Sequence, residues 1–72
     1  MTLDDLRRRS GLTQAQAGER LNVCQEAVSN WETGKNPPLR KYHKILQRIY
    51  DCSPEQLQEA IENTMRRKQH EN

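Results

Sequence analysis

The chain has 72 residues, of which 32% are hydrophobic and none is Phe, and it carries a formal net charge of +2. Such a chain has room for one domain with a small core, near the lower size limit for folding alone. No apolar run approaches the length of a membrane span, and no secretion signal is recognised, so we expect a cytoplasmic protein without a membrane partner.

The charge is unevenly distributed along the chain. Residues 1–50 hold nine Lys/Arg against five Asp/Glu, whereas residues 51–72 hold three against five. The first two-thirds is therefore the better candidate for binding a polyanion. A basic balance is also common in other soluble proteins, so this asymmetry alone decides nothing.

The two cysteines, Cys24 and Cys52, do not form a close pair, and there is no CxxC motif. His43 and His70 are not at metal-ligand spacing, so we expect neither a zinc site nor a cofactor. One disulfide remains an alternative, but without a secretion signal we expect buried, reduced thiols.

A first helix is predicted between Thr2, which can cap its start, and Gly11, which can end it. Two aspartates in its first turn suit the positive end of the helix dipole, and two leucines three residues apart face the core. Three consecutive arginines either complement the dipole at the helix end or contact phosphate. These residues are Asp4 and Asp5, Leu3 and Leu6, and Arg7, Arg8 and Arg9.

Residues 12–35 predict two short helices joined by a tight turn. Thr13 and Gln16 have the spacing of a capping box, in which each side chain accepts a hydrogen bond from the other residue's backbone N–H. Ala17 and Leu21 lie four apart on one face of the helix that follows. Asn22 tolerates a left-handed backbone, so it can end this helix and turn the chain.

The second of these helices spans Gln25 to Glu32 and has two different sides. Cys24, Val28 and Trp31 are spaced to point into the core. The other side carries short hydrogen-bonding groups that can pair with the edges of DNA bases. They are equally well explained as ordinary polar surface residues, and the pattern alone leaves both interpretations open. These residues are Gln25, Glu26, Ser29 and Asn30.

Residues 33–38 form a loop, in which Gly34 permits a left-handed turn and Pro38 can start the next helix. That helix is predicted from about Leu39 to Tyr50, followed by a short connector at residues 51–52. Its apolar residues fall at helical spacing and are expected in the core. They are Leu39, Tyr42, Ile45, Leu46 and Ile49.

The last helix begins at Ser53, Pro54 and Gln56, which supply a cap, a first-turn proline and a capping-box partner. Leu57 and Ile61 are expected to close the core. The rest of their stripe can form a two-fold contact with a second copy, and it comprises Ala60, Thr64 and Met65. We expect one domain over residues 1–64 and a polar tail that frays over residues 65–72.

The central segment resembles the helix-turn-helix of the lambda-repressor-like family, the Cro/repressor type (XRE family) of bacterial and phage DNA-binding domains. The resemblance covers roughly residues 3–62 and implies a compact, all-α, five-helix domain with the helix-turn-helix at its second and third helices. The matching residues are Leu12, Thr13 and Gln14, Leu21, Val23, Val28 and Ser29, Trp31 and Glu32, and Gly34 and Lys35.

The resemblance also implies roles for individual residues. The third helix would enter the major groove, with Gln25, Glu26, Ser29 and Asn30 reading bases. An ion pair between Arg7 and Glu32 would join the first and third helices, leaving Arg8 and Arg9 for solvent or the DNA backbone. Gln14 would bind a DNA phosphate, although it can also be a helix-start residue that faces water. The other expected phosphate contacts are Lys35, Asn36 and Arg40.

Three positions depart from the family pattern. Ala17 replaces a larger aliphatic residue, and Gly18 replaces an alanine at a cost of about 1 kcal/mol in helix propensity. Small side chains there permit close helix approach. Cys24 replaces the Ser or Thr that caps the recognition helix, which puts that cap in doubt because a thiol is a poor acceptor.

These observations together predict a transcriptional regulator, acting as a repressor, that binds double-stranded DNA. A homodimer through the last helix would match a palindromic operator. The same fold also serves as a protein-interaction module, including antitoxins, and the modest net charge with Glu26 on the reading face keeps a protein partner open. An enzyme is not expected, because no nucleophile–base pair or phosphate-binding loop is present.

Overall fold

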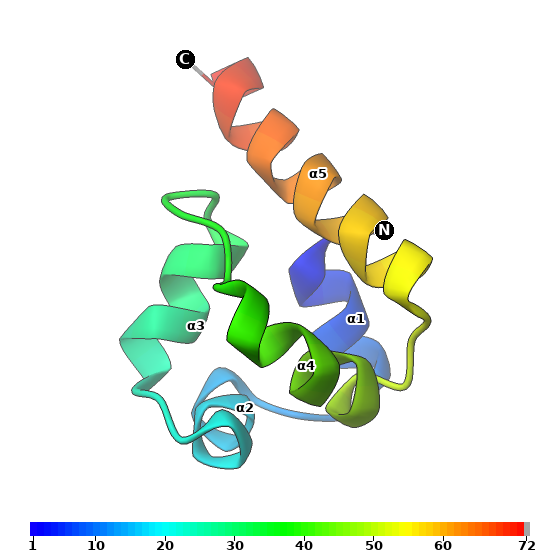
Figure 1. Ribbon diagram of the computed structural model, residues 1–72. Helices are drawn as coiled ribbons and strands as arrows, with labels where there is room; N and C mark the ends of the chain where they lie inside the picture. Colours follow the sequence, from blue (N-terminus) through cyan, green and yellow to red (C-terminus); the bar gives the residue numbers. More distant parts are fainter. Residues whose placement is uncertain (72) are drawn as a thin grey trace.

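The structure is a computed structural model that describes residues 1–71, with side chains described as far as Arg66. Within these residues the fold is entirely helical, as expected (Figure 1). The helix-turn-helix lies at the second and third helices. The elements are α1 (Leu3–Arg9), α2 (Gln14–Leu21), α3 (Gln25–Glu32), the short 3-10 helix η1 (Arg40–Tyr42), α4 (His43–Ile49) and α5 (Pro54–Glu71).

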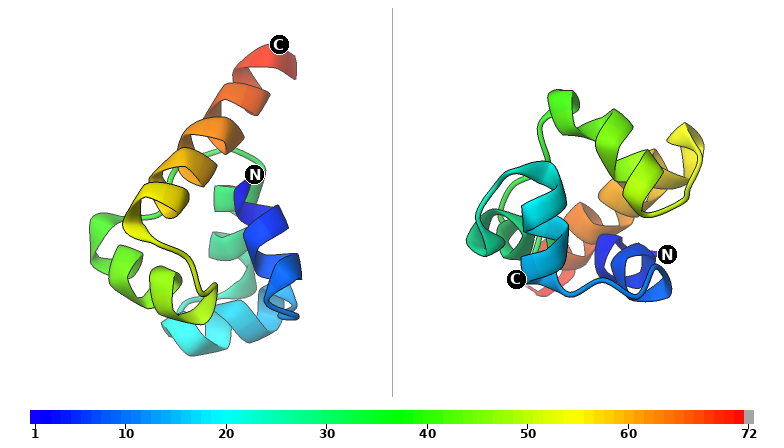
Figure 2. Two further views of the ribbon diagram at one scale, coloured as in Figure 1. Left: turned by 90° about the vertical axis from the view of Figure 1, so that its right-hand side faces the viewer. Right: turned by 90° about the horizontal axis from the view of Figure 1, so that it is seen from below.

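The first four α-helices form a compact body, and α5 lies across it. α2 packs mainly against α3, while α5 packs against α1 and α4. The C-terminal part of α5 extends away from the other helices (Figures 1 and 2). Among residues 1–71, no helix has both the length and the apolar character required to cross a bilayer.

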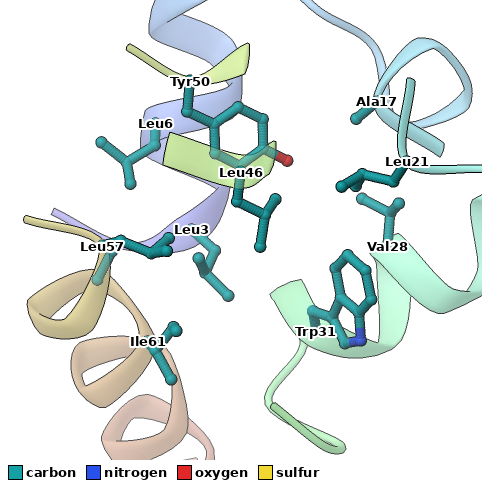
Figure 3. Packing of buried hydrophobic residues seen from close by; sticks show 11 residues of the cluster. Leu3, Leu6, Ala17, Leu21, Val28, Trp31, Leu46, Tyr50, Leu57 and Ile61 are labelled. Carbon is teal, nitrogen blue, oxygen red and sulfur yellow. The ribbon is translucent and has the colours of Figure 1, made fainter. Parts of the chain in front are cut away.

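All five α-helices contribute to one buried cluster (Figure 3). The expected core residues of α1, α2 and α3 are buried, and the Trp31 ring lies 5.5 Å from the Tyr42 ring, centroid to centroid. Tyr50 was not expected in the core but is 2% exposed, and this burial raises the pKa of its hydroxyl. The cluster comprises Leu3, Leu6, Ala17, Leu21, Val28, Trp31, Leu46, Tyr50, Leu57, Ala60 and Ile61.

Helices α1 to α4 end in the same way. Each is followed by a residue in the left-handed conformation, namely Gly11, Asn22, Gly34 and Asp51, with φ of 74°, 60°, 79° and 50°. The residue after each of these four donates its backbone N–H to the carbonyl five positions before it. Examples are the bonds from Val23 N–H to the Gly18 carbonyl (2.9 Å) and from Cys52 N–H to the Gln47 carbonyl (3.0 Å). This pattern is the Schellman motif. The predicted ends at Gly11, Asn22 and Gly34 are confirmed.

Two helix starts carry the predicted capping boxes. The Thr13 hydroxyl accepts from Gln16 N–H at 3.1 Å, and the Gln16 amide oxygen accepts from Thr13 N–H at 2.9 Å. Ser53 and Gln56 make the equivalent pair at 3.1 and 2.9 Å. At the start of α1, the Asp5 carboxylate accepts from the backbone N–H of Thr2, which lowers the pKa of Asp5.

The helix predicted from Leu39 to Tyr50 differs from the structure. Its first turn is the 3-10 helix η1, and Leu39 precedes it with an extended backbone (φ −65°, ψ 151°). Because a 3-10 turn contains fewer residues than an α-turn, the helical spacing counted from Leu39 does not apply. Leu39 is consequently 61% exposed. Ile45 lies inside α4, next to the buried Leu46, and is 37% exposed. The assignment of both residues to the core was therefore wrong.

The prediction that Cys24 points into the core was also wrong. Cys24 is exposed because it is the N-cap of α3, with φ −75° and ψ 157°, so its four-residue spacing from Val28 does not place both on one helix face. Cys52 is half-buried, and this burial raises the pKa of its thiol. Both thiols are free, and the described residues contain no group of three or more potential metal ligands.

The α5 stripe is largely used within the chain. Ala60 and Thr64 are both 1% exposed. The Thr64 hydroxyl accepts from Leu3 N–H at 3.0 Å and donates to the Ala60 carbonyl at 2.8 Å. These two residues are therefore covered by the same chain and are not free to contact a second copy.

α5 is longer than the sequence predicted. It continues past residue 64 to Glu71, and no Gly or Pro interrupts residues 65–71. The predicted division into a domain over 1–64 and a tail over 65–72 stays a prediction, and Asn72 lies outside the described residues.

Candidate nucleic-acid interface

The two sides of α3 have opposite environments. Val28 and Trp31 are buried in the core (Figure 3). On the other side, Gln25 and Glu26 are exposed, and Ser29 and Asn30 are half-buried. No described residue hydrogen-bonds with any of these four polar side chains. Their donors and acceptors are therefore available to a partner.

The start of α3 lacks a side-chain cap. Cys24 occupies the N-cap position, but its thiol accepts no hydrogen bond from the first turn. The backbone carbonyl of Cys24 accepts from Ala27 N–H at 3.1 Å. The N–H of Ala27, from which a Ser or Thr hydroxyl at this position could accept, is bonded to this backbone carbonyl instead.

Arg7 and Glu32 form a bidentate ion pair between α1 and α3. Arg7 Nε lies 2.7 Å from Glu32 Oε2, and Nη2 lies 3.1 Å from Oε1. The two side chains are 14% and 6% exposed. Arg7 Nη1 also donates to the Leu12 carbonyl at 2.9 Å. The hydrogen bond to Glu32 raises the pKa of Arg7, and Glu32 does not face the exposed side of α3.

Gln14, the first residue of α2, makes a contact that sequence reasoning missed. Its side-chain Nε2 donates to Glu32 Oε1 at 3.0 Å, and the residue is half-buried. An amide nitrogen has two hydrogens, so a second donor remains. No sequence signal relates these two residues, because they lie 18 positions apart on different helices.

Three of the predicted phosphate contacts are exposed and close to α3 in sequence. Lys35 and Asn36 lie in the turn after α3, and Arg40 begins η1. None of the three side chains has a hydrogen-bond or ion-pair partner among residues 1–71. The segment that carries them leaves the end of α3 and returns to α4 (Figure 1).

The arginines that follow Arg7 have partners within the chain. Arg8 pairs with Asp4 on the exposed side of α1. Arg9 Nη2 donates to the carbonyls of Tyr50 and Asp51, at 3.2 and 3.0 Å. Arg9 thus caps the C-terminal end of α4, where a cation is favourable. This role was not predicted.

Comparison with known families decides what this arrangement is. Residues 1–60 match a family model described as helix-turn-helix domain. The chain belongs to this helix-turn-helix family. Neither the curated proteins nor the solved structures gave a match.

Membership of the helix-turn-helix family is consistent with the lambda-repressor-like resemblance. Such domains typically bind DNA, without catalysis, through the second helix of the motif, whose N-terminal residues approach base edges in the major groove. In this helix-turn-helix domain the second helix is α3, and its N-terminal residues Gln25 and Glu26 are exposed.

Proposed function

We propose that this helix-turn-helix protein binds double-stranded DNA sequence-specifically and represses transcription. α3 enters the major groove, and Gln25, Glu26, Ser29 and Asn30 read base edges. The observation that carries the proposal is the polar side of α3, whose polar side chains make no hydrogen bond with the described residues, while Val28 and Trp31 anchor the opposite side. Amide, carboxylate and hydroxyl groups on such a helix match the donors and acceptors of the major groove.

The backbone of the DNA is held by a second group of residues in this proposal. Lys35, Asn36 and Arg40 are exposed and without partners among residues 1–71, as phosphate contacts require in the free protein. Gln14 adds a contact from the start of α2, using the amide hydrogen that Glu32 does not bind. Phosphate contacts set the position of α3 but do not distinguish sequences.

We further propose that two copies associate through α5 and bind a palindromic operator with half-sites about 34 Å apart. Because Ala60 and Thr64 are buried, the contact uses the neighbouring exposed side of α5. An open groove of about 660 Å³ lies there, between α5 and the segment that runs from the loop after α3 into α4. Its lining is partly apolar and partly polar or charged: Pro37, Pro38, Ile61 and Met65, and Arg40, His43, Gln58, Glu62 and Arg66. A second copy seated here would cover Met65, and sedimentation equilibrium with and without Met65→Lys tests this dimer.

Selection of binding sites from random duplex DNA is the direct test. A repressor of this kind should enrich one palindromic sequence, and its affinity should fall steeply with salt concentration. A protein-interaction module such as an antitoxin should enrich no sequence and show little salt dependence. Absence of both enrichment and salt dependence would therefore reject DNA reading in favour of the protein-interaction alternative.

Two variants separate reading from positioning. Gln25→Ala should cost roughly 1–3 kcal/mol at one base position and leave the other positions unchanged. Lys35→Ala should weaken binding to all sequences alike and reduce the salt slope by about 1. Lys44→Ala, an exposed cation outside the proposed contacts, is the matched control. Unchanged base preference in Gln25→Ala would show that this residue does not read DNA.

A further inference from the structure

One carboxylate connects three helices beside the proposed DNA contacts. Glu32 Oε2 accepts from Arg7 Nε at 2.7 Å, and Glu32 Oε1 accepts both from Arg7 Nη2 at 3.1 Å and from Gln14 Nε2 at 3.0 Å. Arg7 lies on α1, Gln14 at the start of α2 and Glu32 at the end of α3. The Glu32 carboxylate therefore joins the end of α3 both to α1, through Arg7, and to the start of α2, through Gln14.

This contact changes what Gln14 can do. A free glutamine side chain samples many rotamers and loses that freedom when it binds a ligand. With one amide hydrogen held by Glu32, the Gln14 side chain is already ordered in the free protein, and its second hydrogen has no partner among the described residues. The positive charge of Arg7 balances the negative charge of Glu32, so the network presents no net negative charge to a phosphate.

We propose that Glu32, held in place by Arg7, is a positioning residue that aims the Gln14 amide at a DNA backbone phosphate. This inference rests on the proposed DNA-binding function. Its consequence is that the phosphate contact of α2 keeps a constant position relative to α3, because both depend on the Glu32 carboxylate. The ordering of Gln14 then adds no entropic cost when DNA binds.

A set of variants tests the coupling. Arg7→Met/Glu32→Leu removes both charges together, which proteins commonly tolerate better than removal of one partner. This double variant should fold but bind every duplex sequence roughly twofold to tenfold more weakly, the range expected for ordering one such side chain at binding. Gln14→Ala should weaken binding at least as much. The triple variant should lose no more than Gln14→Ala alone, whereas additive losses would show that Glu32 acts through the fold and would overturn the positioning role.

A second measurement needs no DNA and no variant. The side-chain amide of Gln14 in the free wild-type protein should show the restricted ¹⁵N relaxation of an ordered group, in contrast to Gln25, which has no partner among the described residues. A Gln14 amide as mobile as that of Gln25 would overturn the positioning role. Failure of the wild-type protein to bind any duplex would instead reject the proposed function, and the positioning role with it.

Discussion

The two helices of the helix-turn-helix have equal length but are stabilised differently. α2 begins with the reciprocal Thr13–Gln16 capping box, and α3 begins at Cys24 without a side-chain cap. Their contributions to the core differ in the opposite sense. α2 contributes Leu21 and the small residue Ala17, whereas α3 contributes Val28 and the larger Trp31. α2 thus depends more on hydrogen bonds within its own segment, and α3 on packing against the rest of the chain.

This difference suits the proposed roles of the two helices. A recognition helix anchored from its inner side can vary its outer side without losing its place in the fold, because the polar side chains there make no hydrogen bond with the described residues. α2, by contrast, needs particular residues at its first turn to begin where it does. Four substitutions test the comparison.

Removal of the main anchor of α3 should have the largest effect. Trp31→Ala should destabilise the protein by about 3–5 kcal/mol, because a large buried ring leaves a cavity. For a domain of this length the total stability is only about 4–11 kcal/mol. Urea unfolding followed by circular dichroism measures the change, and Trp31→Phe should lose less. A loss below about 1 kcal/mol would contradict anchoring of α3 by packing.

Gly18→Ala should destabilise the protein although alanine is the better helix former. A Cβ at this position would lie 2.8 Å from the backbone oxygen of Val23, so the turn between α2 and α3 must shift. Overpacking of about 1–3 kcal/mol outweighs a propensity gain of about 1 kcal/mol, which predicts a net loss of up to about 2 kcal/mol. Ala15→Gly, at an exposed site of α2, measures the propensity difference alone. A stabilised Gly18→Ala protein would mean that the turn yields easily.

Thr13→Ala should cost about 1 kcal/mol by removing the acceptor for Gln16 N–H and half of the α2 capping box. Thermal unfolding measures the loss, and Thr13→Ser, which retains the hydroxyl, is the control. Equal stability of the Ala and Ser variants would show that α2 does not depend on its cap.

The smallest effect is expected at the equivalent position of α3. Cys24→Ser supplies an oxygen that can accept from the first turn, so it should stabilise the protein by up to about 1 kcal/mol. Cys24→Ala has no such acceptor and should be close to neutral, since the thiol makes no cap bond to lose. If the Ser and Ala variants have the same unfolding midpoint, the missing cap does not limit the stability of α3.

Local signals predicted the helix boundaries well and failed where geometry departs from a regular α-helix. Thr13, Asn22 and Ser53 act within a few residues along the chain, and the structure has the predicted hydrogen bonds or backbone angles at each. Leu39 and Cys24 were misplaced because both lie just outside a helix, where α-helical spacing no longer relates one side chain to another.

Residue patterns alone predicted the all-helical class, the starts and ends of helices and the polar outer side of α3. Each of these features depends on residues that lie only a few positions apart. Only the tertiary structure revealed the bond from Gln14 to Glu32, the bond from Leu3 N–H to Thr64 and the capping of α4 by Arg9. These contacts join residues 18 to 61 positions apart, and they exist only because the helices cross at particular angles and distances, which no local pattern specifies.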